Sequence, residues 1–214
     1  MLKIQKKKEG NNAADLLEAV KNHDLTRIMK LLKVGAPAVQ LGHDGTQMPL
    51  HEACLDGSIE IVLALLSFYT KEVMGQVLET RNHQKRTPLH CACFSAQLDV
   101  CFLLIEKGAC MTARCREGNL PIHLLVRNDF KYTHTMMVNH ILLMMKQEGN
   151  VNVNATNDKG ETPLHTTCMG RGCTPVIQIL LRMGANPMLA DKSGKLPIHY
   201  ALALNNSDAV RCLL

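Results

Sequence analysis

The tetrapeptide Thr87-Pro88-Leu89-His90, which begins the stretch TPLHCAC (residues 87–93), decides the fold of this chain. The pattern recurs as MPLH at 48–51, LPIH at 120–123, TPLH at 162–165 and LPIH at 196–199. Successive motif histidines are separated by 39, 33, 42 and 34 residues, so the basic period is close to 33 and two repeats carry insertions. A repeat of this length predicts stacked supersecondary units.

Each copy of the motif predicts the start of a short helix. A threonine before proline caps the helix through its hydroxyl group, and proline suits the first helical position because no N–H donor is needed there. The next apolar residue points into the core, and the histidine can hydrogen-bond a neighbouring turn. Second amphipathic runs follow at 59–66, 98–109, 175–185 and 207–214, and Gly-Ala closes the unit at 35–36, 108–109 and 184–185. Polar segments with another glycine then predict tight hairpins.

With this motif, spacing and Gly-Ala closure, the chain resembles the ankyrin-repeat family. The resemblance implies an all-α repeat solenoid of helix-turn-helix units with β-hairpin fingers. We expect a basic flexible N-terminus at 1–12 and an ankyrin-repeat domain at 13–214, with repeats at about 13–44, 45–80, 81–114, 115–156, 157–190 and 191–214. Leu17 stands at the histidine position of the first unit, as a capping repeat allows. The last unit lacks a polar cap, so we expect further repeats or another domain in a longer parent protein.

Four positions depart from the family pattern. Met48, Leu120 and Leu196 replace the capping threonine. Each loses a side-chain hydrogen bond that contributes about 1 kcal/mol. Lys85 stands where the finger usually has glycine, which leaves the geometry of that turn open.

The histidine and cysteines of TPLHCAC could form a metal site or a Cys–His nucleophile, but the repeat favours packing. The third residue after each motif histidine is small or apolar, which predicts an inward-facing position: Cys54, Cys93, Val126, Cys168 and Leu202. The motif histidines are therefore expected to be structural: His51, His90, His123, His165 and His199.

Other patterns point to no chemistry either, and we predict no catalytic residue, metal or cofactor. The chain has no Cys-x-x-Cys pair, phosphate-binding glycine loop or Gly-x-Ser-x-Gly elbow. The segment MGRGC (169–173) could cradle an anion, and His134 with His140 could bind a metal, but a turn and exposed polar residues are favoured. The thiols are expected to be reduced, and four occupy slots that the family usually exposes: Cys91, Cys110, Cys115 and Cys173.

The resemblance implies a noncatalytic protein–protein interaction module that binds through its fingertips and the concave face of its first helices. The candidate partner-binding residues on these two surfaces are His83, Lys85, Arg86, Phe94, Arg116, Glu117, Asn119, Arg127, Asp158, Lys159, Glu161, Met169, Lys192 and Lys195. Basic residues outnumber acidic ones along the fingertips, which favours an acidic partner segment; a merely solvated edge is the alternative.

Two insertions hold four of the seven aromatic residues. These segments are 67–80, with Phe68 and Tyr69, and 129–140, with Phe130 and Tyr132. Insertions in repeat proteins map to loops, whose rings either bind a partner or pack onto the stack.

Composition limits the classes of function. The chain is 46% hydrophobic with a net charge of +5, begins with a charged segment, and has no apolar run of membrane-spanning length. We expect a cytoplasmic or nuclear monomer with no small-molecule substrate. The alternative function is a regulatory or targeting domain of a larger enzyme or channel that continues beyond residue 214. Binding of nucleic acid or anionic lipid is disfavoured, because acidic residues interrupt the basic patch and no aromatic residues accompany it.

Overall fold

The computed structural model of the chain describes residues 2–39, 48–128, 135–147, 151–170 and 174–214, with side chains described from residue 12 onward. Every regular element in these ranges is a helix, so the all-α class is confirmed. No strand is assigned to the fingers in the described ranges, and two backbone hydrogen bonds close each of these short turns. The chain divides into two compact units, here called unit 1 (residues 1–92 and 99–109) and unit 2 (residues 93–98 and 110–214).

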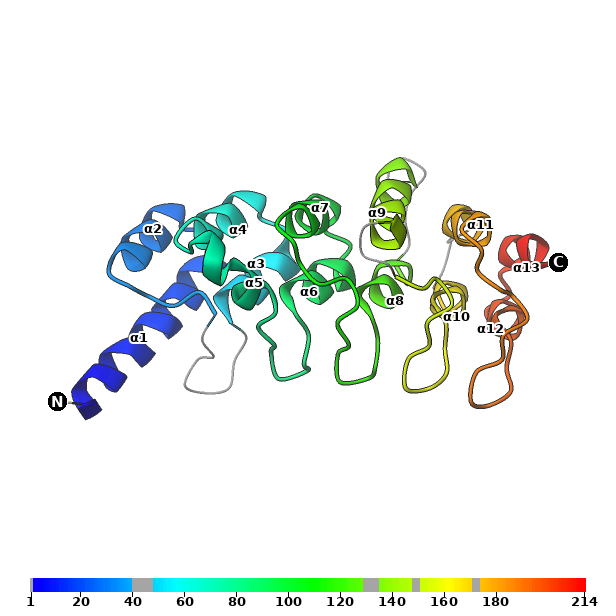
Figure 1. Ribbon diagram of the computed structural model, residues 1–214, viewed down its shortest axis with the longest axis horizontal. Coiled ribbons are helices and arrows are strands. Elements are labelled where there is room, and N and C mark those ends of the chain that lie inside the picture. The colour runs from blue at the N-terminus through cyan, green and yellow to red at the C-terminus, as the bar shows by residue number, and fades with distance from the viewer. Residues whose placement is uncertain (1, 40–47, 129–134, 148–150, 171–173) are drawn as a thin grey trace. The chain divides into compact units, whose positions relative to one another are not determined.

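Unit 1 contains the first helix pairs of the repeat array. Its helices are α1 (Leu2–Lys21), α2 (Leu25–Lys33), α3 (Pro49–Asp56), α4 (Ile59–Leu66), α5 (Lys71–Leu78), most of α6 (Pro88–Phe94) and most of α7 (Leu98–Glu106). Helix α1 packs against α2 and α3, and α4 packs against α2 and α3. Figure 1 shows α2, α4 and α7 in one row, with α3 and α6 in a second row.

Unit 2 repeats the same arrangement. Its helices are α8 (Pro121–Leu125), α9 (Thr135–Gln147), α10 (Pro163–Cys168), α11 (Thr174–Arg182), α12 (Pro197–Ala203) and α13 (Ser207–Leu213). The first helices α8, α10 and α12 pack in sequence, and the second helices α9, α11 and α13 pack in a second layer. Both units therefore consist of stacked helix pairs, as a repeat solenoid requires.

The motif begins its helices as predicted. Proline is the first residue of α3, α6, α8, α10 and α12. Thr162 accepts a weak hydrogen bond from the backbone N–H of His165, whereas Met48, Leu120 and Leu196 make no side-chain capping bond.

The predicted inward slot is buried in four of five repeats. Cys54, Cys93, Val126 and Cys168 have no exposed surface, whereas Leu202 is 54% exposed, so the prediction is wrong for Leu202. Leu202 lies on α12, which packs against α10 and α13.

Two cysteines predicted to be exposed are buried. Cys91 and Cys115 are 0% and 7% exposed, and Asn82 Nδ2 lies 3.8 Å from the Cys91 sulfur. Burial raises the pKa of the Cys91 thiol to about 12 and that of Cys54 well above its usual value. Cys110 is half-buried, and Cys173 lies outside the described residues.

The insertions are more helical than predicted. Residues 71–78 form α5, which is anchored by the buried side chains of Val77 and Leu78. Helix α9 begins at Thr135, inside the segment expected to separate two helices, and the rest of that insertion, with Phe130, Tyr132 and His134, lies outside the described residues. The backbone of residues 2–12 is part of α1. This segment holds four Lys, one Gln and one Glu, all good helix formers.

Candidate protein-binding surface

The motif histidines join each repeat to the finger of the next one. His165 accepts a hydrogen bond at Nδ1 from the backbone N–H of Thr162 (3.1 Å), so its Nε2–H can donate to the carbonyl of Lys195 (3.0 Å). His123 does the same between Leu120 (3.2 Å) and the carbonyl of Glu161 (3.2 Å). Each of these two rings therefore hydrogen-bonds the base of the following finger.

His51 also hydrogen-bonds the finger of the next repeat through Nε2, and its pKa is lowered like that of His123. The Nε2–H of His51 donates to the carbonyls of Thr80 (3.1 Å) and Arg86 (3.0 Å). Burial disfavours the charged imidazolium, and it lowers the pKa of both His51 and His123 to about 4 despite these hydrogen bonds. Both rings are therefore neutral at physiological pH, as this hydrogen-bonding arrangement requires.

An asparagine or aspartate at the base of three fingers closes the turn. The Oδ1 atom of Asn157 accepts from the backbone N–H groups of Lys159 (2.9 Å) and Glu161 (3.0 Å). Asn82 and Asp191 make the equivalent pairs of hydrogen bonds in their own fingers. These residues lie eight positions before a motif histidine, a signal that is visible in the sequence but absent from the predicted site.

The finger of residues 115–119 closes differently, because Cys115 occupies the Asn/Asp position. Its backbone N–H still donates to the carbonyl of Asn119 (3.0 Å). The guanidinium of Arg114 supports the turn, since Nη1 donates to the carbonyls of Gly118 (2.8 Å) and Thr156 (2.8 Å). Arg114 therefore has a structural contact at the base of the finger.

Adjacent fingers of unit 2 are joined through their backbones. The N–H of Asp158 donates to the carbonyl of Glu117 (3.1 Å), and the N–H of Lys192 donates to the carbonyl of Lys159 (3.0 Å). The side chain of Asn157 adds a bond to Asn119 Oδ1 (2.8 Å). The three fingers 115–119, 157–161 and 191–195 therefore form one ordered surface, which we call the three-finger surface.

The last finger has a further polar cluster. The hydroxyl of Tyr200 donates to Asp191 Oδ2 (2.5 Å), and the Lys195 ammonium lies 5.6 Å from the centre of the Tyr200 ring. The hydrogen bond to Asp191 raises the pKa of Tyr200 to about 12. Burial acts to raise the pKa of Asp191, but hydrogen bonds from Tyr200, Lys195 and Ser193 outweigh it and hold that pKa well below its usual range.

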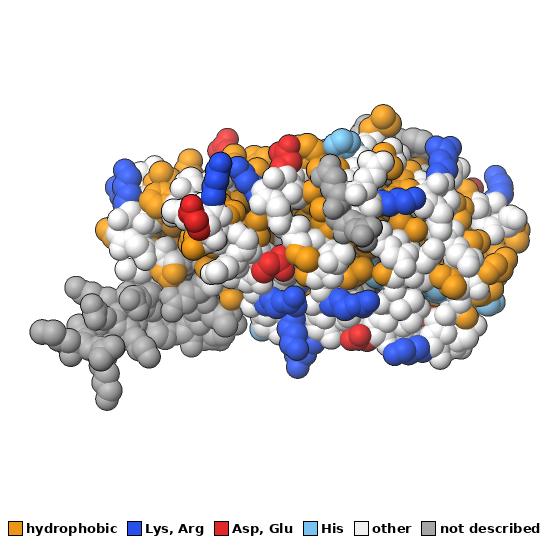
Figure 2. All heavy atoms as spheres, viewed as in Figure 1, with side chains coloured by type: hydrophobic (Ala, Val, Ile, Leu, Met, Phe, Trp, Pro, Cys, Tyr) orange, Lys and Arg blue, Asp and Glu red, His pale blue; other side chains and the backbone are white. Residues whose placement is uncertain are grey.

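Most of the predicted fingertip residues are exposed. Of the predicted fingertip residues in unit 2, six have exposed charged side chains: Arg116, Glu117, Asp158, Lys159, Lys192 and Lys195. Within the described residues, none of the four basic side chains in this set forms an ion pair. Figure 2 shows Lys and Arg side chains projecting at the finger edge, interrupted by a few acidic ones.

Two predicted residues do not belong to the exposed set. Asn119 and Glu161 are 6% and 9% exposed. Glu161 Oε2 accepts from Asn157 Nδ2 (2.8 Å), and Asn119 Nδ2 donates to Glu117 (3.0 Å). Their side chains form hydrogen bonds within and between the fingers, so they are not part of the exposed surface.

The third-repeat finger belongs to unit 1. His83 and Lys85 are exposed and Arg86 is half-buried. Lys85 adopts a left-handed backbone with φ of 55°, close to the values of 70°, 79° and 76° at the glycines of the other three fingers. The turn at Lys85 therefore has the same left-handed geometry as the glycine turns, although a lysine adopts it at a conformational cost.

The repeat sequence and the helix stack identify the family. A family model described as ankyrin repeats (3 copies) matches residues 16–115 and 122–214. The chain belongs to the ankyrin-repeat family. Ankyrin repeats generally mediate protein–protein interaction, and the predicted all-α repeat solenoid is confirmed.

Similar proteins carry ankyrin sequence within longer chains. This chain is 30% identical over 180 residues to the B-cell lymphoma 3 protein homolog of Mus musculus, which covers 84% of this chain and 38% of that protein. It is 27% identical over 165 residues to Transient receptor potential cation channel subfamily A member 1 of Homo sapiens, which covers 77% and 14%. Identity to the Nuclear factor NF-kappa-B p105 subunit of Gallus gallus is 23% over 188 residues, covering 87% and 18%. The chain thus spans less than two fifths of the length of each relative.

The concave-face positions of the ankyrin stack in unit 2 are accessible to different degrees. Phe94 is 45% exposed, Arg127 is exposed and Met169 is half-buried. Asn128, next to Arg127, donates through Nδ2 to the carbonyl of Cys93 (2.8 Å) and ties α8 to the end of α6. Of the two apolar side chains in this set, Phe94 is the more exposed.

The described ranges hold neither a candidate metal site nor a candidate membrane-spanning helix. No group of three or more His, Cys, Asp or Glu side chains there is placed to hold a metal ion. None of the described helices combines the length and the apolar character needed to cross a membrane.

Proposed function

We propose that this ankyrin-repeat chain is a noncatalytic protein-binding module whose three-finger surface, with the adjoining concave face of unit 2, engages an acidic segment of a partner protein. The observation that carries the proposal is the ordered row of exposed, unpaired basic side chains Arg116, Lys159, Lys192 and Lys195. The backbone of these turns is already ordered by hydrogen bonds, so binding does not have to order a loop. The basic side chains also steer an oppositely charged partner toward the surface.

The acidic residues within this surface shape its preference. Glu117 and Asp158 are exposed between the basic tips, while the Asp191 carboxylate is held beneath them by internal hydrogen bonds. A partner that places its carboxylates at the tips avoids Asp191 and meets mainly ammonium and guanidinium groups. Phe94 and Met169 supply apolar contacts on the concave face, and Arg127 adds a cation there. The finger of unit 1 adds the exposed side chains of His83 and Lys85 and the half-buried side chain of Arg86.

The test is affinity capture from cell lysate at low and moderate salt, followed by titration of each captured protein against purified variants. A triple variant, Arg116→Glu, Lys192→Glu and Lys195→Glu, removes the basic tips. The matched control, Lys30→Glu, Lys71→Glu and Lys107→Glu, makes the same charge change at exposed lysines outside the fingers. We expect at least a tenfold loss of affinity, about 1.4 kcal/mol, for the tip variant alone. Equal binding by both variants would contradict the proposal.

A second function is favoured by the comparisons: a regulatory or targeting domain of a longer enzyme or channel. The support is the similarity over 77% of this chain to a protein named as a cation channel, of which it covers 14%. Under this proposal, deletion of the ankyrin repeats from the full-length protein leaves its activity present but changes its regulation or cellular location. Loss of a complex with no change in any activity favours the first proposal instead.

A further inference from the structure

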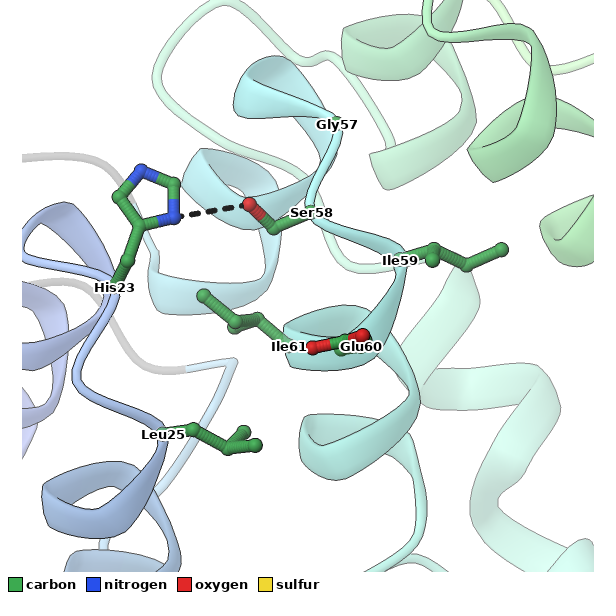
Figure 3. Close-up of a pocket in the computed structure, with 7 residues that line it drawn as sticks. All are labelled: His23, Leu25, Gly57, Ser58, Ile59, Glu60 and Ile61. Carbon is green, nitrogen blue, oxygen red and sulfur yellow. Dashed lines mark hydrogen bonds between the residues drawn. The ribbon is translucent and has the colours of Figure 1, made fainter.

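A surface pocket in unit 1 lies apart from the fingers. It has a volume of about 350 Å³ and is formed where the turn between α1 and α2 meets the turn between α3 and α4 (Figure 3). Its lining residues are His23, Leu25, Gly57, Ser58, Ile59, Glu60 and Ile61. None of them is among the predicted partner-binding residues, because neither turn carries a repeat-motif signal.

The apolar part of the pocket comes from the first turns of two helices. Leu25 begins α2 and is 39% exposed, and Ile59 begins α4 and is 37% exposed. Figure 3 shows Leu25 and Ile61 pointing into the space between α2 and α4. The Ile59 side chain points away from them, so Leu25 and Ile61 form the apolar surface of the pocket. Covering the partly exposed Leu25 side chain is favourable.

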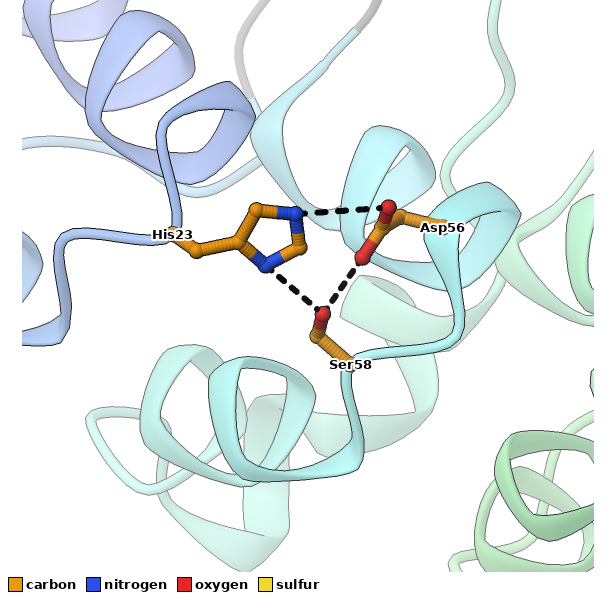
Figure 4. A network of polar contacts seen from close by, with 3 residues as sticks. All are labelled: His23, Asp56 and Ser58. Atoms are coloured by element: carbon orange, nitrogen blue, oxygen red, sulfur yellow. Dashed lines mark hydrogen bonds and ion pairs between the residues drawn. The ribbon is translucent and has the colours of Figure 1, made fainter.

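A ring of polar contacts forms the upper wall and joins the two turns (Figure 4). His23 Nδ1 lies 3.1 Å from Ser58 Oγ, and His23 Nε2 lies 3.5 Å from Asp56 Oδ1. The Ser58 hydroxyl donates to the other Asp56 oxygen. Because this hydroxyl proton is directed to the carboxylate and not to the imidazole, the trio is not arranged as a nucleophile with its base. These three contacts fix the wall of the pocket and occupy the polar groups of Asp56 and Ser58.

The carboxylate of Glu60 is the charge that remains available at the rim. It is exposed, and within the described residues it forms no hydrogen bond or ion pair. Asp24 and Asp56 lie at the same two turns, so the negative charge exceeds what His23 can balance. Two basic residues, Lys21 and Arg27, flank the turn between α1 and α2 in the sequence, and Arg27 is already paired with Glu18 (3.1 Å) and Asp15 (3.9 Å). The first turn of α4 adds a partial positive charge, which is smaller than the charge of these carboxylates.

We propose that this pocket binds a lysine or arginine side chain of a partner protein. The aliphatic stem lies on Leu25 and Ile61, and the cationic head lies beside the Glu60 carboxylate. Long basic side chains combine these two requirements, an apolar stem and a terminal charge. The charge preference is opposite to that of the three-finger surface, so this is a second, independent binding surface of the chain.

The proposal is tested by titrating short peptides into ¹⁵N-labelled protein and following backbone amide signals. The probes are acetyl-Leu-Arg-Leu-amide, its neutral citrulline analogue, and acetyl-Leu-Glu-Leu-amide. We expect the arginine peptide to shift the amides of Gly57, Ser58 and Ile61 with a Kd on the order of 1 mM. The citrulline and glutamate peptides should bind at least about fivefold more weakly. Equal binding of the citrulline peptide, or preferential binding of the glutamate peptide, overturns the proposal.

Matched variants separate the pocket from general surface effects. Glu60→Gln should weaken the arginine peptide by about fivefold, whereas Glu106→Gln, which removes an exposed charge from α7 of the same unit, should have no effect. Leu25→Ser should also weaken it, and Leu63→Ser, at a 44% exposed position of α4 that does not line the pocket, should not. If both members of either pair weaken binding equally, the pocket is not the site. Unchanged amide signals of the fingertip glycines Gly118, Gly160 and Gly194 would show that the peptide does not bind the three-finger surface.

Discussion

Gly118 and Asp158 lie so close together that a methyl group at position 118 would meet the Asp158 carboxylate at 2.2 Å and its backbone nitrogen at 2.8 Å. Gly160 has the same relationship to the next finger, where a methyl group would meet the backbone nitrogen of Lys192 at 2.8 Å. Glycine at these two positions therefore satisfies two requirements: a positive φ and the close approach of neighbouring finger backbones.

Replacing these glycines by alanine should show the two requirements separately. Gly194 also has a positive φ of 76°, but a methyl group there would meet nothing within 4 Å. Gly194→Ala should lower the free energy of unfolding by about 1 kcal/mol, the cost of the left-handed backbone. Gly160→Ala should lower it by about 2–4 kcal/mol, because the fingers must also move apart. Urea unfolding measures both, and equal losses would show that finger contact contributes nothing.

The side chain of Asn157 makes four hydrogen bonds in the three-finger surface, as many as that of Asp191. It accepts two backbone N–H bonds and donates to Asn119 and Glu161. Asn157→Ala leaves these buried groups without partners and should cost about 2–4 kcal/mol of unfolding free energy. Asn152→Ala is the control, since exposed Asn152 accepts one bond, from the N–H of Asn154 (2.9 Å), and should lose under about 1 kcal/mol. A loss at Asn157 no larger than the control's would mean that water replaces these bonds.

The helix pairs are predictable from sequence because their determinants are local. Proline, a capping group and a glycine at a helix end act within a few residues, so the motif places α3, α6, α8, α10 and α12 correctly. Burial of Cys91 and formation of α5 depend on surfaces supplied by distant segments, and a single sequence does not show these. The pocket at His23 and Ser58 escapes prediction for the same reason, since its walls are 35 residues apart in the chain.

The buried histidines predict acid sensitivity. In the unfolded chain His51 and His123 have the ordinary pKa of 6.5, but their pKa in the folded protein is about 4. Above pH 6.5 both states are neutral and stability is at its full value. As the pH falls from 6.5 to 4, the unfolded chain binds protons that the folded protein excludes, so each histidine removes up to about 3 kcal/mol.

Unfolding by urea at a series of pH values tests this expectation. In His123→Gln the slope of unfolding free energy against pH between pH 6 and 4.5 should fall by about 1.4 kcal/mol per pH unit, because one proton fewer is taken up. Leu124→Ala, at a buried position of the same helix, should lower stability without changing the slope. An unchanged slope in His123→Gln would show that this ring titrates equally in both states.

The left-handed backbone of Lys85 leads to a prediction about its finger. With φ of 55°, this residue is in a conformation that β-branched side chains strongly disfavour. Lys85→Val should therefore lose about 1–2 kcal/mol of unfolding free energy, and Lys85→Gly should lose nothing or gain up to about 1 kcal/mol. Gln84→Val places the same side chain at the adjacent exposed position, which has no positive φ, and should change stability by less than about 0.5 kcal/mol. If Lys85→Val and Gln84→Val have equal effects, the finger relaxes to another turn, and Lys85 is retained for its charge and not for its conformation.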